Sequence, residues 1–176
     1  LFKVSAAPFH FWTPDVYEGA PTIFTMFMST IVKTASFAAL FHLVSGIFGS
    51  LYTVWVLPVY FISMLTLVVG NISAVYQQSV KRMLAFSSIS HAGYLLLTVS
   101  SKQISTTSSI LYYSLSYTLA TVVAFAVLIL VSEYQSARVE KPENFSSFEG
   151  LAKNNPGLAL CFSISMLSLA GIPLTA

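Results

Sequence analysis

The chain has 176 residues, of which 56% are hydrophobic and only 8% are charged, and its mean hydropathy is +0.79. A soluble domain usually carries about 25% charged residues, so this composition excludes an ordinary soluble protein and predicts a polytopic membrane protein. The net charge of +2 comes without a basic run, and we expect no nucleic-acid partner. The single cysteine, Cys161, excludes an internal disulfide framework and a self-contained iron–sulfur site.

The first segment, residues 1–21, is apolar but is interrupted by Pro8, Pro14 and Pro21. Proline removes a backbone donor and clashes with the preceding turn, so Pro8 is expected to end or kink a helix that arrives through Lys3. Lys3 would then lie about one turn before a helix break, inside the membrane.

The next segment, about residues 22–46, is almost wholly apolar and carries Lys33 at its centre. As a helix rising about 1.5 Å per residue, it can cross a hydrocarbon core of about 30 Å, with Lys33 near mid-depth. A charged side chain there costs at least about 2.5 kcal/mol. Lys33 is therefore either a structural lysine paired with a carboxylate or an amine that relays protons.

Further apolar segments alternate with short polar ones along the rest of the chain. We predict an all-α membrane helix bundle, one membrane domain over residues 1–176, whose remaining spans cover about residues 54–76, 83–99, 106–132 and 156–176. Residues 133–154 form the one polar loop of some length. The last span carries a second expected helix break at Pro173. Broken segments that recur after unbroken spans are typical of the inverted repeats of transporters.

The distribution of positive charge predicts the orientation of these spans. The turns near residues 46–53 and 100–104 carry a single Lys or Arg, whereas the loops near 77–82 and 133–154 carry five: Lys81, Arg82, Arg138, Lys141 and Lys153. By the positive-inside rule, the loop at 133–154 lies in the cytoplasm or mitochondrial matrix.

Two of the predicted spans carry polar side chains at helical spacing. In the third, one face carries Ser87, Ser88, His91 and Tyr94 at helical spacing, and a histidine can exchange protons near neutral pH. The alternative is a histidine bonded to a neighbouring backbone carbonyl. The fourth span has a stripe that we interpret as helix–helix packing, because small polar residues join helices in lipid; its members are Tyr113, Ser116, Tyr117 and Thr121.

Motifs for redox or nucleotide chemistry are absent from the sequence. There is no glycine-rich nucleotide fingerprint, no phosphate-binding loop and no cysteine cluster. His10 with Asp15 and Glu18 does not match a recognised metal-binding spacing. We therefore expect no metal site, no cofactor and no nucleotide site on this chain.

Three stretches resemble one known family. They are FKVSAAPFHFWTPDVYEGAPT at 2–22, QQSVKRMLAFSSISHAGY at 77–94 and SLAGIPLTA at 168–176. They resemble the antiporter-like subunits of respiratory NADH:quinone oxidoreductase (complex I). The version PFHFWTPDVYEGAPT is similar to the N-subunit branch of that family, called subunit 2 in mitochondria.

This resemblance implies proton translocation in the membrane arm, coupled to quinone reduction elsewhere in the complex. Lys3 matches the lysine of a broken span that works with a glutamate on an earlier helix. Lys33 matches the lysine of the following span, which connects two half-channels, and His91 matches a polar position near the central axis. Lys3, Lys33 and His91 are thus the expected proton-relay residues, acting on a hydrated polar axis.

The resemblance also implies the setting of the chain. NADH, FMN, the iron–sulfur clusters and quinone would bind other subunits, and the partners would be other membrane subunits and the lipid bilayer. The membrane would be a bacterial plasma membrane or the mitochondrial inner membrane. The sequence of residues 77–94 resembles bacterial members more and favours the first.

A full family member has about fourteen spans, so the chain is expected to be a piece that lacks N-terminal and C-terminal parts of its subunit. The expected glutamate partner of Lys3 and a lysine after residue 176 would lie in those parts, and proton conduction by this piece alone is not expected. Two alternatives stay open: a subunit of a cation/proton antiporter complex, and a structural subunit whose lysines anchor its neighbours through ion pairs.

Overall fold

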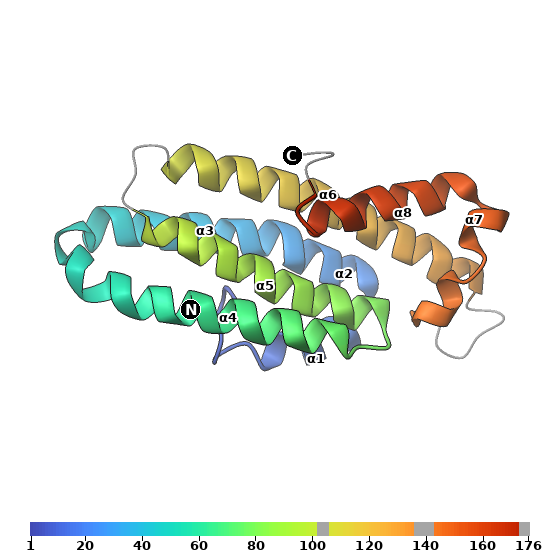
Figure 1. The fold of residues 1–176 in the computed structure, drawn as a ribbon, viewed down its shortest axis with the longest axis horizontal. Coiled ribbons are helices and arrows are strands. Elements are labelled where there is room, and N and C mark those ends of the chain that lie inside the picture. Colours follow the sequence, from blue (N-terminus) through green and yellow to red (C-terminus); the bar gives the residue numbers. More distant parts are fainter. Residues whose placement is uncertain (102–105, 136–142, 173–176) are drawn as a thin grey trace.

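The structure is a computed structural model that describes residues 1–101, 106–135 and 143–172. Long helices run side by side along the long axis of the molecule (Figure 1). The predicted all-α class is confirmed: the described residues contain helices and a single isolated β-bridge, between Ser79 and Asn144.

The helices follow one another with short connections. Their bounds are α1 Trp12–Gly19, α2 Thr22–Phe27, η1 Met28–Val32, α3 Lys33–His42, η2 Leu43–Ile47, η3 Gly49–Leu51, α4 Tyr52–Val75, α5 Val80–Ser100, α6 Thr106–Gln135, η4 Phe145–Phe148, α7 Leu151–Asn154 and α8 Pro156–Leu169.

Four of the resulting helical rods are long and apolar enough to cross a membrane, as judged by length and composition. They are Thr22–Ile47, Gly49–Val75, Val80–Ser100 and Thr106–Gln135. The first is built from α2, η1, α3 and η2 without a break in the rod. Helix α8 has 14 residues, which corresponds to about 21 Å and is less than the core of a bilayer.

The two expected helix breaks have different outcomes. Pro8 lies in a stretch of turns that precedes α1, and the backbone N–H of Ala7 donates to the Thr66 hydroxyl of α4 at 2.9 Å. Helix α8 ends at Leu169, two residues before Gly171, whose φ is +81°. Pro173 lies outside the described residues.

Helix α5 is the central helix of the bundle. Most of its residues are buried. Its most extensive contact is with α4, and the two helices approach each other at two glycines. A Cβ at Gly70 would lie 2.8 Å from the Ser90 backbone nitrogen, and one at Gly93 would lie 2.8 Å from Leu67 Cγ. Small residues let membrane helices approach closely. The glycines therefore bring α4 and α5 into backbone contact.

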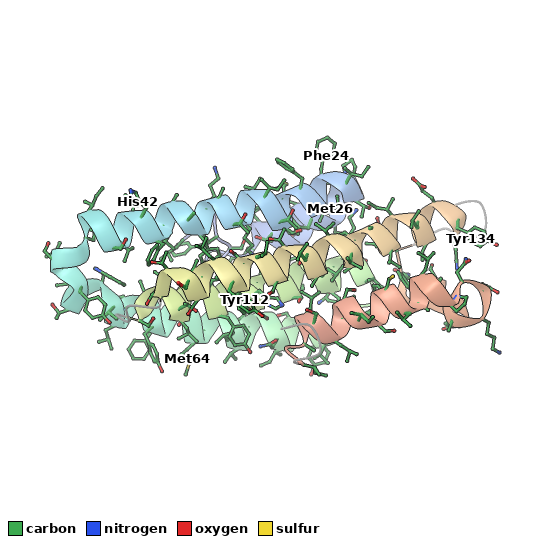
Figure 2. The ribbon with its side chains drawn as sticks, turned by 90° about the horizontal axis from the view of Figure 1, so that it is seen from above. Phe24, Met26, His42, Met64, Tyr112 and Tyr134 are labelled. Atoms are coloured by element: carbon green, nitrogen blue, oxygen red, sulfur yellow. The ribbon has the colours of Figure 1, made fainter. Side chains whose placement is uncertain are left out.

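The outer surface of the bundle is apolar. Phe24 and Met64 are exposed and lie on the outside of the rods that carry them (Figure 2). In α4 most of the large side chains are exposed, which suits a helix that faces lipid.

Candidate functional site

A π-helical turn precedes the central lysine. In η1 the polar side chains bond back to the preceding turn: Ser29 Oγ donates to the Met26 carbonyl at 3.0 Å and Thr30 Oγ1 donates to the same carbonyl at 2.6 Å. Such back-bonding hydroxyls compete with the regular backbone ladder, and single π-turns in helices are frequent at functional sites. Lys33 is the first residue after this turn.

Lys33 points into the bundle and is 3% exposed. Its ammonium donates to the backbone carbonyl of Ser88 on α5 and, at 2.9 Å, to the Ser88 hydroxyl. Among the residues that the structure describes, no carboxylate forms an ion pair with Lys33. The lysine is thus held by neutral oxygen atoms.

His91 lies three residues after Ser88 on the same face of α5. Its Nδ1 is 2.6 Å from the Tyr113 hydroxyl of α6, and its ring packs against Tyr117 with a centroid separation of 4.8 Å. The imidazole also faces the backbone carbonyl of Leu169 at the end of α8. Lys33 and His91 are therefore brought to successive turns of one helix face, bridged by Ser88.

Tyr17 of α1 is a further polar residue of this region, and the sequence reading did not assign it to the site. It is 2% exposed and bonds Ser88. Burial raises the pKa of the Tyr17 phenol above its usual value of 10.0, and the nearby Tyr117 phenol raises it further, while the bond to Ser88 acts in the opposite direction. Tyr17 is thus a neutral hydroxyl at physiological pH.

Lys3 does not share the environment of Lys33. It is exposed, and with Val32 and Ser36 it lines a groove along the outer side of the rod that carries Lys33. Lys3 therefore lies at the surface of the described part of the chain, and its role in a proton relay stays a prediction. Residues 1–10 lie mostly in turns, in which Val4, Ser5, Ala6 and Ala7 are buried while Lys3 is exposed.

The second buried lysine is Lys81, although the charge pattern of the sequence predicts a loop at residues 77–82. It is 3% exposed, and its ammonium donates to the Ala20 carbonyl at 2.7 Å and to Glu143 Oε1 at 3.0 Å. The Thr22 hydroxyl donates to the same carboxylate oxygen at 3.0 Å. Glu143 thus joins the start of α2 to the start of α5.

Arg82 completes this end of the bundle at the surface. Its guanidinium pairs with Asp15 at 3.1 Å and also bonds Glu18, both on α1. The signal in the sequence was the Lys81–Arg82 pair that begins two residues after Ser79, whose hydroxyl accepts from the Arg82 N–H and caps α5. A cap at Ser79 places both cations in the first helical turn rather than in a loop.

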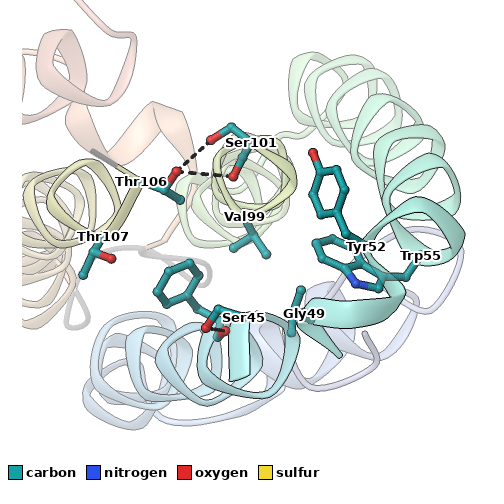
Figure 3. A pocket seen from close by; sticks show the side chains of 10 residues that line it. Ser45, Gly49, Tyr52, Trp55, Val99, Ser101, Thr106 and Thr107 are labelled. Atoms are coloured by element: carbon teal, nitrogen blue, oxygen red, sulfur yellow. Dashed lines mark hydrogen bonds between the residues drawn. The ribbon is translucent and has the colours of Figure 1, made fainter. Parts of the chain in front are cut away.

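A cavity at the opposite end of the bundle has a different character. It lies between the ends of α3 and α5 and the starts of α4 and α6, and none of the described residues that line it is charged (Figure 3). Its polar groups bond the backbone: Tyr52 OH donates to the Ser100 carbonyl at 2.8 Å and Trp55 Nε1 to the Phe48 carbonyl at 2.9 Å. This cavity is separate from the lysine site.

Metal-binding side chains do not gather in the described ranges. No group of three or more His, Cys, Asp or Glu side chains lies close enough together there to hold an ion. The chemistry that the site offers is proton exchange between an amine, an imidazole and hydroxyl groups.

A bundle of long apolar helices around a buried lysine is the frame of an integral membrane subunit. The family model described as "NADH:quinone oxidoreductase/Mrp antiporter, TM" matches residues 1–176, and the chain belongs to this family. The resemblance noted in the sequence is thereby confirmed.

Several curated relatives within the family carry the same subunit name. The chain is 49% identical to the NADH-quinone oxidoreductase subunit N of Cytophaga hutchinsonii over 173 residues, which is 98% of this chain and 36% of the relative. It is 47% identical to the subunit N of Trichlorobacter lovleyi, over 100% of this chain and 35% of the relative. The chain thus spans about a third of the length of these relatives.

Solved structures agree with the fold. A chain of respiratory complex I from Thermus thermophilus matches with a TM-score of 0.76 and 39% identity, over 98% of this chain and 36% of that chain. A chain of the Mrp complex from Dietzia matches with a TM-score of 0.86 and 25% identity, over 98% of this chain and 31% of that chain. Both neighbours are parts of multi-subunit membrane complexes.

Proposed function

We propose that this chain forms part of the N subunit of a proton-translocating NADH:quinone oxidoreductase. The support is the family membership and the identity of 41–49% to relatives named as that subunit. NADH, FMN, iron–sulfur clusters and quinone would bind other subunits. The chain would pack against further membrane subunits and the rest of its own subunit, in a bacterial plasma membrane.

The observation that carries the proposal is the environment of Lys33. An ammonium at mid-depth in a membrane needs a partner or a function, and in the described structure its acceptors are the carbonyl and hydroxyl of Ser88. A neutral amine can keep a hydrogen bond with these groups, so the lysine can lose and regain its proton without leaving a carboxylate unpaired.

His91 provides the next station in this proposal. A proton that leaves Lys33 would pass along the α5 face to the imidazole, which contacts the Tyr113 hydroxyl on α6. Histidine exchanges protons readily near neutral pH. Lys3 would serve a second station on the outer groove, facing a part of the subunit beyond this chain. Quinone reduction elsewhere would drive the transfers.

The structural alternative fits Lys81 better than Lys33. Lys81 is paired with Glu143 and tethers two helix starts, as expected of a lysine that anchors structure. Lys33 has hydroxyl and carbonyl acceptors instead. The two buried lysines therefore suggest two different roles in one bundle.

Substitution with arginine tests the proposal in the intact complex. Arginine keeps a positive charge but does not release its proton in proteins. Lys33→Arg should abolish most NADH:quinone turnover, whereas Lys81→Arg, the matched control, should keep the ion pair and the turnover. Assembly is followed on native gels. Wild-type turnover and pumping in assembled Lys33→Arg complex would refute a relay at this lysine.

The antiporter alternative rests on one observation: the TM-score to the Mrp chain is 0.86. A cation/proton antiporter would show transport that depends on sodium or another monovalent cation. Proton pumping by the intact complex that is unchanged on replacing sodium with choline would exclude this alternative.

A further inference from the structure

A short stretch of chain directly after Lys3 is buried although it lies outside the helices. Its members are at most 3% exposed: Val4, Ser5, Ala6 and Ala7. Two of them, Val4 and Ala6, belong to the same core cluster as Phe37 of α3. Non-helical backbone within a membrane protein is tolerated where it is buried in protein that satisfies its polar groups. The hydrogen bonds of this stretch therefore identify the residues that hold it.

Ser5 turns the chain from the surface into the core. Its φ is +63°, in the left-handed region that residues with a Cβ rarely adopt. Its N–H donates to the Phe2 carbonyl at 3.1 Å, and its hydroxyl accepts from the Thr13 hydroxyl of α1 at 2.7 Å. A strained backbone conformation persists only where the surrounding structure determines it. Thr13, which is fully buried, supplies such a contact.

Thr66 of α4 fixes the other end of the stretch. Its side chain is fully buried, and its Oγ1 accepts from the Ala7 N–H at 2.9 Å while it donates to the Ile62 carbonyl at 2.6 Å. The next residue, Pro8, has no N–H to satisfy. Thr66 thus ties the stretch to a neighbouring helix and uses both its donor and its acceptor.

We propose that Thr13 and Thr66 are positioning residues that hold residues 4–7 in one conformation and thereby fix the place of Lys3. This role rests on the proposed function, since it concerns the station assigned to Lys3. Neither threonine exchanges a proton. Each acts through the backbone that follows the lysine, one from α1 and the other from α4.

The groove that Lys3 lines explains why its position matters. Val32 and Ser36, which lie on either side of Lys33 in the sequence, line the same groove. A reacting group that is displaced by about 1 Å can lose about a hundredfold in rate. A stretch that changed its conformation between Lys3 and α1 would move the amine along this groove or out of it.

The experiment removes one hydrogen bond of the stretch in the intact complex. Thr66→Val keeps the shape of the side chain and removes the acceptor of the Ala7 N–H, whereas Thr66→Ser retains it. Thr53→Val, at an exposed position of the same helix, is the matched control. We expect NADH:quinone turnover to fall about fivefold in Thr66→Val and to stay near wild type in the other two.

The Lys3→Met background separates positioning from a general loss of structure. A residue that acts through Lys3 causes no further loss once the amine is gone. The double variant of Thr66→Val with Lys3→Met should therefore turn over at the rate of Lys3→Met alone. Losses that multiply in the double variant, or wild-type turnover in assembled Thr66→Val, overturn the inference.

A second pair keeps the test decisive if Thr66→Val fails to assemble. Thr13→Val removes the donor to Ser5 and should lower turnover, again without further loss in Lys3→Met, whereas Thr13→Ser should stay near wild type. Equal behaviour of the serine and valine variants overturns the inference. If Lys33→Arg fails while the threonines act independently of Lys3, the positioning role is wrong and the proposed relay at Lys33 stands.

Discussion

Lys33 and Lys81 are both 3% exposed, yet the ammonium of Lys81 lies 3.0 Å from a carboxylate oxygen of Glu143 and that of Lys33 bonds the neutral oxygens of Ser88. Lys81 lies on α5, and Lys33 of α3 reaches α5 at Ser88. One helix therefore presents a fixed charge pair near its start and an uncompensated amine site two turns further on.

Removing the carboxylate partner of Lys81 should destabilise the protein. In Glu143→Leu the ammonium, with a side chain 4% exposed, keeps the Ala20 carbonyl but loses its counter-charge. A broken buried pair costs about 3–5 kcal/mol, and we expect the lower end because Glu143 is 28% exposed. Thermal unfolding of the purified complex measures the loss. The exposed Glu149→Leu is the control, and the double variant Lys81→Met with Glu143→Leu should recover part of the stability.

The hydroxyl of Ser88 should matter more than that of its neighbour. Ser88→Ala removes the 2.9 Å acceptor of the Lys33 ammonium and leaves the carbonyl. A hydrogen bond to a charged group contributes about 1.5–3 kcal/mol, so we expect NADH:quinone turnover to fall about tenfold or more. Ser87→Ala, one residue away on another side of α5, should remain near wild type. Equal effects of the two alanines would contradict the assigned contact.

Tyr113 should hold the imidazole in place. Tyr113→Phe removes the hydroxyl that lies 2.6 Å from His91 Nδ1 and keeps the ring. Because one hydrogen bond has a net value of about 1 kcal/mol, a fall in turnover of about fivefold is expected. The pH profile of turnover should change as well, since the imidazole loses the hydroxyl that contacts its Nδ1. An unchanged profile would mean that His91 does not exchange protons during turnover.

The contact between α4 and α5 should tolerate no added methyl group. In Gly70→Ala the new Cβ would meet the backbone nitrogen of Ser90 at 2.8 Å, and backbone cannot move aside cheaply. We expect a loss of about 1–3 kcal/mol in thermal stability of the complex. Gly157→Ala in α8 is the control, because nothing lies within 4 Å of a Cβ there.

The sequence was sufficient for the all-α class, for the long apolar helices and for the presence of a lysine inside one of them. Uninterrupted apolar runs predict membrane helices because the hydrocarbon core requires a backbone whose hydrogen bonds are made internally. A lysine within such a run is easily recognised in the sequence because charged residues are rare there. The His91 prediction relied on helical spacing, which also brought Ser88 onto the same face.

Tertiary contacts decided the rest. Lys81 became a buried residue because Glu143, 62 positions later, folds back onto the start of α5. Tyr17 entered the site because α1 packs against α5, a contact that no local pattern encodes. The π-turn before Lys33 carries the back-bonding hydroxyls of Ser29 and Thr30, and no pattern in the sequence indicated this change in helix type.

The central claim is that Lys33 is a proton-relay amine, and Lys33→Met in the intact complex tests it most directly. Methionine keeps the length of the side chain and removes the charge, and the exposed Lys153→Met is the control. NADH:quinone turnover and proton uptake are read in the same vesicles. We predict an assembled complex in which turnover and pumping fall together while the control stays normal. Full turnover with full pumping in Lys33→Met would contradict the relay and leave Lys33 a structural amine.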